Sequence, residues 1–173
     1  MTIELISPEN VPPEHFGTLV RLADGRTQVR FERHFKHPIE RVWAAITVAE
    51  QRDQWFPNFR LEPKLHGSFE IWFSEECDGP AHVQGSVIEF EPGRILHCGS
   101  MRYELSPTDD GCQLVFTDVL HFAEPRSDEE ITNAVLGGWH RHTDNLEEFL
   151  DGVLAGPHGP EIDYRKVDVA GRD

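Results

Sequence analysis

The sequence predicts an α+β fold in which an antiparallel sheet lies against one long helix near the C-terminus. Two observations support this prediction. Between residues 68 and 122, short runs of alternating apolar and polar residues follow one another with tight turns between them, which is typical of an antiparallel sheet. From Ser127 onward, the apolar residues instead recur every three or four positions, as in an amphipathic helix.

The region before these strands is predicted to contain a β-hairpin and two short helices. Residues 17–35 form two extended runs around Asp24-Gly25, a pair that favours the positive φ angles of a tight turn. Pro38 suits the first position of a helix, and the residues after it have one apolar face. Thr47 and Glu50 match a capping box, so we expect a second short helix to begin there.

Turn signals separate the strands that follow. Asp78-Gly79-Pro80, Pro92-Gly93 and Asp109-Asp110-Gly111 each combine residues that favour turns. The strands expected between them cover residues 69–73, 82–90, 94–98, 101–105 and 112–122. Together with the hairpin, these strands predict one antiparallel sheet.

The long helix is predicted to begin at Ser127, which forms a capping box with Glu130, and to run for roughly 26 residues. Two adjacent glycines, Gly137 and Gly138, lie within it, and each costs about 1 kcal/mol relative to alanine. Their missing side chains permit a close backbone approach or leave room for a ligand. An alternative interpretation is that one helix ends near Leu136 and a second begins at Trp139.

The length of 173 residues predicts a single domain. We expect an N-terminal arm over residues 1–16, the domain over residues 17–153 and a flexible tail over residues 154–173. The tail is assigned because the residues after Gly156 have no periodicity and are rich in glycine, proline and charge.

Charge and cysteine content exclude several classes of function. A net charge of −15 argues against nucleic-acid partners and anionic membranes, because both require clustered basic side chains. No apolar run approaches a membrane span and no secretion signal is evident, so we expect no membrane insertion and a cytoplasmic location. The three cysteines are widely spaced and are expected to be reduced thiols.

Three stretches resemble a known family. Residues 38–47 with Gln54-Trp55-Phe56-Pro57 are similar to its opening signature, residues 85–96 to its central strand pair, and Gly138-Trp139-His140 with Asp144 and Leu146 to its final helix. The family is the branch of the SRPBCC, or START-like, superfamily that is related to the activator of the heat-shock-protein-90 ATPase. The resemblance spans most of the chain, from Gly17 to Gly152.

This resemblance implies the helix-grip fold. In that fold a curved antiparallel sheet of about six to seven strands wraps around a long C-terminal helix, with two short helices after the first strand. The gap between sheet and helix is the usual ligand cavity. The sequence departs from the branch at Thr143, where an apolar residue is usual, and at Tyr103, where tryptophan is common.

Strand parity and the resemblance together select candidate residues for the inner surface of such a cavity. Aromatic and aliphatic side chains dominate this set, and their rigid, flat walls suit an apolar or aromatic ligand. The candidate ligand-binding residues are Trp55, Phe59, Phe69, Ile71, Phe73, Tyr103, Phe116, Asp118, Trp139 and His142.

The polar members of this set have competing interpretations. Asp118 shares parity with Phe116, so it is a candidate to orient a polar group of a ligand. The alternatives are that it lies beyond the solvent-exposed edge of the sheet or pairs with an arginine such as Arg141. His142 lies on the apolar face of the helix. It is expected to be a hydrogen-bonded core histidine, and the alternative is that it lines the cavity. His140 and Asp144 lie one helical turn apart; a structural hydrogen bond or solvent-facing pair is preferred to a metal or acid–base site.

The primary functional hypothesis is a cofactor-free binding protein for a small hydrophobic or aromatic molecule. No zinc-ligand spacing, phosphate-binding loop or serine-nucleophile motif is present. A cochaperone-like or stress-related interaction domain is the second hypothesis and rests on the resemblance alone. The third is a cyclase or dehydratase in which Asp118, Tyr103 or His82 moves protons. The N-terminal hairpin also offers a free edge, so we add a homodimer as a hypothesis.

Overall fold

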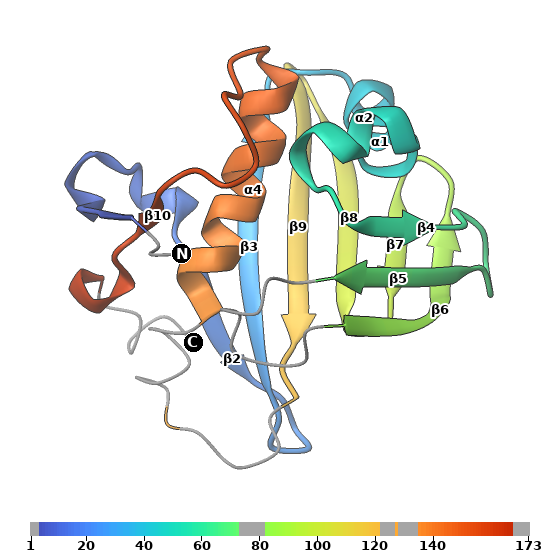
Figure 1. The fold of residues 1–173 in the computed structure, drawn as a ribbon, viewed down its shortest axis with the longest axis horizontal. Helices are drawn as coiled ribbons and strands as arrows, with labels where there is room; N and C mark the ends of the chain where they lie inside the picture. Colours follow the sequence, from blue (N-terminus) through green and yellow to red (C-terminus); the bar gives the residue numbers. More distant parts are fainter. Residues whose placement is uncertain (1–3, 73–81, 122–126, 128–134, 168–173) are drawn as a thin grey trace.

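The fold is built around one curved antiparallel sheet (Figure 1). The computed structural model describes residues 4–72, 82–121, 127 and 135–167. Within these residues the main sheet has eight strands in the order β2-β3-β9-β8-β7-β6-β5-β4. The strands are β2 (Thr18–Arg21), β3 (Thr27–Phe35), β4 (Phe59–Leu61), β5 (Ser68–Trp72), β6 (His82–Glu91), β7 (Ile95–Cys98), β8 (Met101–Thr108) and β9 (Gly111–Val119).

In the described part of the chain, three α-helices lie against this sheet. They are α1 (Ile39–Thr47), α2 (Ala49–Trp55) and α4 (Gly137–Leu150). In Figure 1, β4 and β5 run nearly crosswise to β3 and β9, which shows how strongly the sheet curves. Helix α4 packs against α1, α2 and β3. This arrangement confirms the predicted α+β helix-grip fold.

The core lies between the sheet and the helices. Phe31 on β3 is paired in register with Phe116 on β9, and both side chains are fully buried. Val29, Phe35 and Leu114 follow the same alternation and are also buried. The period of two in the sequence therefore identified the inner face of these strands correctly.

One strand was missed. The sheet has eight strands rather than the predicted six to seven because β4, only three residues long, adds an edge next to β5. So short a segment, between Pro57 and Pro63, shows too little alternation to be recognised in the sequence. The turns at Asp24-Gly25 and Pro92-Gly93 were predicted correctly, and Gly25 and Gly93 have φ angles of 90° and 79°. The turn predicted at residues 78–80 lies outside the described residues.

Two predictions about helix starts were wrong. Pro38 is the N-cap of α1 rather than its first helical residue. The N-cap of α2 is Val48, which makes no side-chain cap, so the predicted Thr47–Glu50 capping box does not form. Thr47 is still the last residue of α1, and its hydroxyl donates to the Trp43 carbonyl oxygen at 2.8 Å.

The two glycines are the first two residues of α4. Leu136 has helical backbone angles of −62° and −37°, so the chain is not broken between Leu136 and Trp139, as the alternative interpretation required. The helix ends at Leu150, slightly before the predicted end at Val153. Residues 128–134 lie outside the described part of the chain, and with them Glu130 and the predicted capping box.

The two terminal segments pack together beside α4. Strand β1 (Leu5–Ile6) pairs in parallel with β10 (Glu161–Ile162), and the 3₁₀ turn η4 (Tyr164–Lys166) follows β10. Figure 1 shows them on the side of α4 away from β4–β6. Ile162 and Tyr164 are only 5% and 3% exposed, although composition suggested a flexible tail from residue 154. The described residues contain no helix long and apolar enough to cross a membrane.

Candidate functional site

A cluster of aromatic rings fills the space between α4 and the sheet. His142 on α4 lies at its centre, with ring centroids 4.4 Å from Phe56, 5.0 Å from Trp55 and 5.2 Å from Phe116. Trp139 lies one turn earlier on α4, 5.0 Å from both His142 and Phe116. The helix periodicity that places residues 139 and 142 on one face therefore directs both rings toward β9.

His142 is held by a buried hydrogen bond. Its Nε2 lies 2.8 Å from the hydroxyl of Tyr103 on β8. Burial lowers the pKa of His142 to about 3 and raises the pKa of Tyr103 well above its ordinary value. Both groups are therefore neutral near pH 7, which is how a hydrogen-bonded core histidine behaves.

Asp118 marks the polar end of this cluster. Its carboxylate is 8% exposed and accepts hydrogen bonds from the Ser100 hydroxyl, at 2.6 Å, and from the side chain of Trp139. Burial raises the pKa of Asp118 to about 6, although both hydrogen bonds oppose the shift. Asp118 is not paired with Arg141, whose guanidinium bonds Asn145 and Glu148 on α4 instead.

The other apolar candidates extend the cluster toward β4 and β5. Phe59 lies 5.1 Å from Phe56 and 6.4 Å from Phe69, between ring centroids. Phe69 and Ile71 are 3% and 2% exposed. The Phe69 ring covers Gly85 and Gly99, since a Cβ built there would lie 3.0 Å and 2.7 Å from it. The structure thus brings nine of the ten candidates into one cluster, and Phe73 lies outside the described residues.

Arg52 closes the cluster near α2. The side chain is 2% exposed, and its guanidinium donates to the carbonyl oxygens of Ile46, Thr47 and Phe59. It also lies over the Phe59 ring, 5.0 Å from the centroid. Arg52 therefore ties the end of α1 to β4 and supports the cluster from behind.

The three alternative proton-transfer residues of the third hypothesis lie in different surroundings. His82 is exposed at the start of β6, where its ring stacks on Trp72 and its Nε2 lies 3.0 Å from Glu70. Asp118 and Tyr103 are instead buried beneath α4. Cys98 and Cys112 are also buried, and burial raises their thiol pKa values to about 12 and about 11. In the described part of the chain no group of His, Cys, Asp or Glu side chains could hold a metal ion.

Sequence reasoning missed a second polar cluster on the other side of α4. His140 is 1% exposed, and its Nδ1 lies 2.6 Å from the Tyr164 hydroxyl. Its Nε2 lies 3.4 Å from Asp144, which pairs with buried Arg33 at 2.7 Å. A structural hydrogen bond or a solvent-facing pair was expected for His140 and Asp144. The burial of His140 was not expected, because the segment that covers it had been assigned to a tail. Arg33 could have been found, since it shares the inward parity of Phe31 and Phe35 on β3.

The model of the family described as activator of Hsp90 ATPase homolog 1-like protein matches residues 36–151. These residues include the helices α1, α2 and α4, the strands β4–β9 and every candidate residue named above. The chain belongs to this family. Membership in the family of Hsp90 ATPase activator homologues confirms the resemblance seen in the sequence.

Solved structures share the same fold. A conserved protein of unknown function from Enterococcus faecalis is 19% identical over 86% of this chain and 84% of its own, with a TM-score of 0.64. CalU16 from Micromonospora echinospora is 20% identical over 79% of this chain and 82% of its own, with a TM-score of 0.57. A protein from Mesorhizobium loti is 23% identical over 72% of this chain and 97% of its own, with a TM-score of 0.58. A search among curated proteins gives no match.

Proposed function

We propose that the protein binds a small hydrophobic or aromatic molecule between the sheet and α4, at the end of the cluster formed by Trp139 and Asp118. The observation that supports this proposal is a buried carboxylate at the edge of an aromatic wall, bonded to Trp139 and Ser100. Ligand sites commonly combine apolar walls with a few polar groups that fix orientation. The family is known for ligand binding or cochaperone activity.

The packing favours this end of the cluster over its centre. Around His142 the rings lie at contact distance on several sides, so a ligand there would have to displace core side chains. Trp139, by contrast, is only partly buried. No described atom lies within 4 Å of a Cβ built at the neighbouring Gly138. The ligand is therefore expected to rest on the Trp139 indole.

Asp118 sets the chemistry of the ligand. Each carboxylate oxygen has two lone pairs, so an oxygen that already accepts one hydrogen bond can accept another. A flat apolar molecule with one N–H or O–H donor would therefore match the site. Molecules with an anionic group are disfavoured, because the ionised carboxylate repels them.

Binding of N-phenyl-1-naphthylamine, a neutral aromatic dye with one N–H donor, tests the proposal. The wild-type protein should bind the dye with enhanced fluorescence. Trp139→Ala should weaken binding by about tenfold or more, because a large apolar contact is lost. The matched control is Trp43→Ala on α1, where Trp43 is also partly buried but packs on Phe90 at 5.7 Å, outside the cluster. Equal losses in both variants, or no binding to the wild type, would contradict the proposal.

The family match favours a second candidate, a cochaperone-like role, because the family is described by its likeness to an activator of the Hsp90 ATPase. In that case the purified protein should raise the ATPase rate of a partner chaperone of the Hsp90 type. An unchanged ATPase rate at saturating protein would remove this candidate. The dye experiment is independent of this result, so the two proposals can fail separately.

A further inference from the structure

The two ends of the chain form a structure that lies outside the family match. The N–H groups of Glu161 and Asp163 donate to the carbonyl oxygens of Glu4 and Ile6, each at 2.9 Å, and join β10 to β1. Neither strand falls within residues 36–151, which the family model matches. Residues 161–167, called the C-terminal strap below, therefore add to the domain that the family shares.

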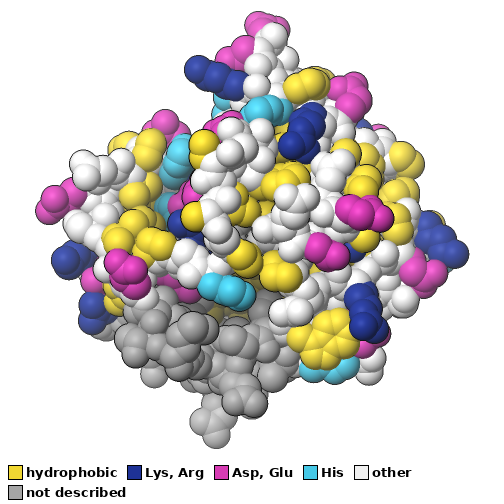
Figure 2. Space-filling view, turned by 45° about the horizontal axis from the view of Figure 1, so that its top comes forward, with side chains coloured by type: hydrophobic (Ala, Val, Ile, Leu, Met, Phe, Trp, Pro, Cys, Tyr) yellow, Lys and Arg dark blue, Asp and Glu magenta, His cyan; other side chains and the backbone are white. Residues whose placement is uncertain are grey.

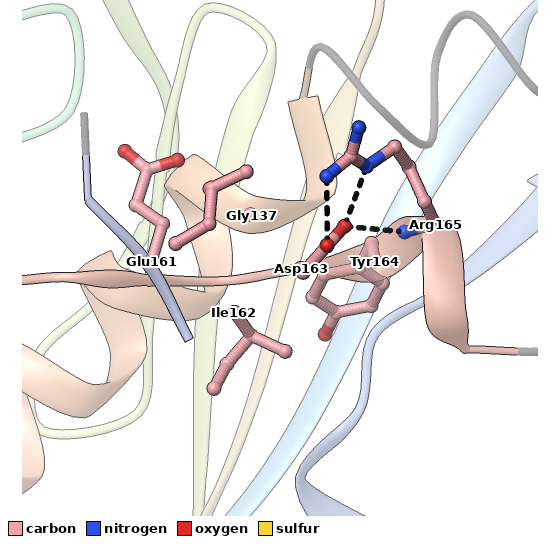
Figure 3. Close-up of a pocket in the computed structure, with 7 residues that line it drawn as sticks. Gly137, Glu161, Ile162, Asp163, Tyr164 and Arg165 are labelled. Carbon is pink, nitrogen blue, oxygen red and sulfur yellow. Dashed lines mark hydrogen bonds and ion pairs between the residues drawn. The ribbon is translucent and has the colours of Figure 1, made fainter. Parts of the chain in front are cut away.

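The C-terminal strap contacts α4 closely at Gly137. A Cβ built on Gly137 would lie 3.1 Å from the Glu161 Oε1 and 3.2 Å from the Ile162 carbonyl oxygen. Figure 3 shows Gly137 beside this segment, with the Asp163 carboxylate paired to the Arg165 guanidinium. These residues also line a small pocket between the strap and α4. Only glycine permits this approach without moving the strap or the Glu161 side chain.

A second contact holds α4 one turn later. The Tyr164 hydroxyl lies 2.6 Å from His140 Nδ1 and accepts the N–H of Gly17 at 2.9 Å. Burial lowers the pKa of His140, so the imidazole is neutral near pH 7. A neutral ring matches this network if Nδ1 accepts from Tyr164 and Nε2 donates to Asp144. Tyr164 thus links the strap, the N-terminal segment and α4 at one atom.

Asp144, His140 and Tyr164 follow the order carboxylate, imidazole, hydroxyl that activates nucleophiles in some hydrolases. Tyr164 is only 3% exposed, however, and its oxygen already accepts the Gly17 N–H. A substrate has no access to that oxygen without displacing the strap. Tyr164 is therefore a positioning residue rather than a catalytic nucleophile.

We propose that the C-terminal strap positions Trp139 and thereby controls exchange of ligand at the Trp139–Asp118 site, with Tyr164 as the positioning residue. Gly137 and His140 flank Trp139 within one helical turn, and the strap holds both of them. When the strap leaves, this turn can shift, and the Trp139 indole separates from Asp118 and Phe116. The control of ligand exchange rests on the proposed binding function, whereas the positioning of the helix turn does not.

The variant Tyr164→Phe tests the strap, because it removes one hydroxyl and keeps the ring. Amide hydrogen exchange at residues 137–143 should become about tenfold faster, because a buried hydrogen-bonded contact that holds this turn is lost. Exchange in β8 should stay unchanged. Stopped-flow mixing with N-phenyl-1-naphthylamine should show faster dye association and dissociation than in the wild type. The control is Thr108→Val, which removes a hydroxyl that lies 3.0 Å from His34 Nε2 on β3 and belongs to β8 rather than to the strap.

The outcomes separate the two proposals. Unchanged amide exchange in Tyr164→Phe would overturn the strap as a positioning device, whether or not the dye binds. Faster exchange with unchanged dye kinetics would overturn the control of ligand exchange and leave dye binding intact. If the wild type binds no dye, the proposed function fails, and the exchange data alone still decide whether the strap holds α4. Equal effects in Thr108→Val would likewise count against the strap.

Discussion

Asp118 lies in surroundings that disfavour the charged form of its side chain. A carboxylate on an inward position of β9 loses hydration, and the pKa rises to about 6 from an ordinary value of 3.8. The hydrogen bonds from Ser100 and Trp139 lower the pKa of Asp118 and offset only part of the rise that burial causes. Such a residue lowers stability at neutral pH, which is a common property of functional sites.

This environment predicts a pH dependence of stability. Because the folded-state pKa is raised, the stabilising contribution of Asp118 is complete below pH 3.8 and is lost as the pH rises through about 6. Asp118→Asn cannot ionise. The free energy of unfolding of the variant, relative to the wild type, should therefore increase by on the order of 2–3 kcal/mol between pH 4 and pH 7.5. Urea unfolding at both pH values measures this, and parallel pH profiles would show that Asp118 does not titrate as described.

Sequence reasoning worked at this scale where a periodic pattern fixed the direction of a side chain. Asp118 and Phe116 share the inward parity of β9, and Trp139 and His142 share one face of α4, so these four residues were predicted together. The partners of His140 were not predicted. Tyr164 lies 24 residues away in a segment without periodicity, and no local pattern indicates that it returns to α4.

At the scale of elements, the pair Gly137-Gly138 has two different explanations. Gly137 allows the C-terminal strap to approach α4, since its built Cβ lies 3.2 Å from the Ile162 carbonyl oxygen. Gly138 is exposed and has no described neighbour within 4 Å of such a Cβ. The close backbone approach expected from the sequence thus exists, but the strap makes it rather than the sheet.

This difference predicts opposite effects of two adjacent substitutions. Gly138→Ala should raise the free energy of unfolding by about 0.5–1 kcal/mol, because alanine favours the helix and no described atom opposes it. Gly137→Ala should bring no gain or a loss, because the new Cβ forces the strap to move. Thermal or urea unfolding of the two variants measures the difference. A gain in Gly137→Ala as large as in Gly138→Ala would show that the strap does not press on the helix.

Whether an element could be predicted depended on its length. The longer strands and α1, α2 and α4 repeat their pattern often enough to identify the fold. The strands β1, β4 and β10 have two or three residues each, and they form only where tertiary contacts supply partners. The predicted capping box failed because α1 and α2 follow each other so closely that Thr47 still belongs to the first helix.

At the scale of the whole molecule, the chain carries a net charge of −15. Figure 2 shows acidic and basic side chains interspersed on one face, with hydrophobic side chains between them. Ion pairs such as Arg102–Glu89 and Arg30–Glu32 join neighbouring charges of opposite sign.

The assembly state stays a prediction. Among the described strands, β2 is the last one at one end of the main sheet, and β3 is its only neighbour there. An edge of this kind can pair with a second copy of the chain, as the homodimer hypothesis requires. The C-terminal strap and the N-terminal segment cover the nearby face of α4, so such a dimer would form through β2 rather than through the helix.

The central claim is that a ligand rests on Trp139 and bonds to Asp118. A crystal structure of the protein with N-phenyl-1-naphthylamine tests this claim most directly. We predict electron density for the dye against the Trp139 indole, with its nitrogen within hydrogen-bond distance of the Asp118 carboxylate. Dye density elsewhere on the molecule would contradict the account. So would a structure in which no dye binds and side chains fill the space beside Trp139.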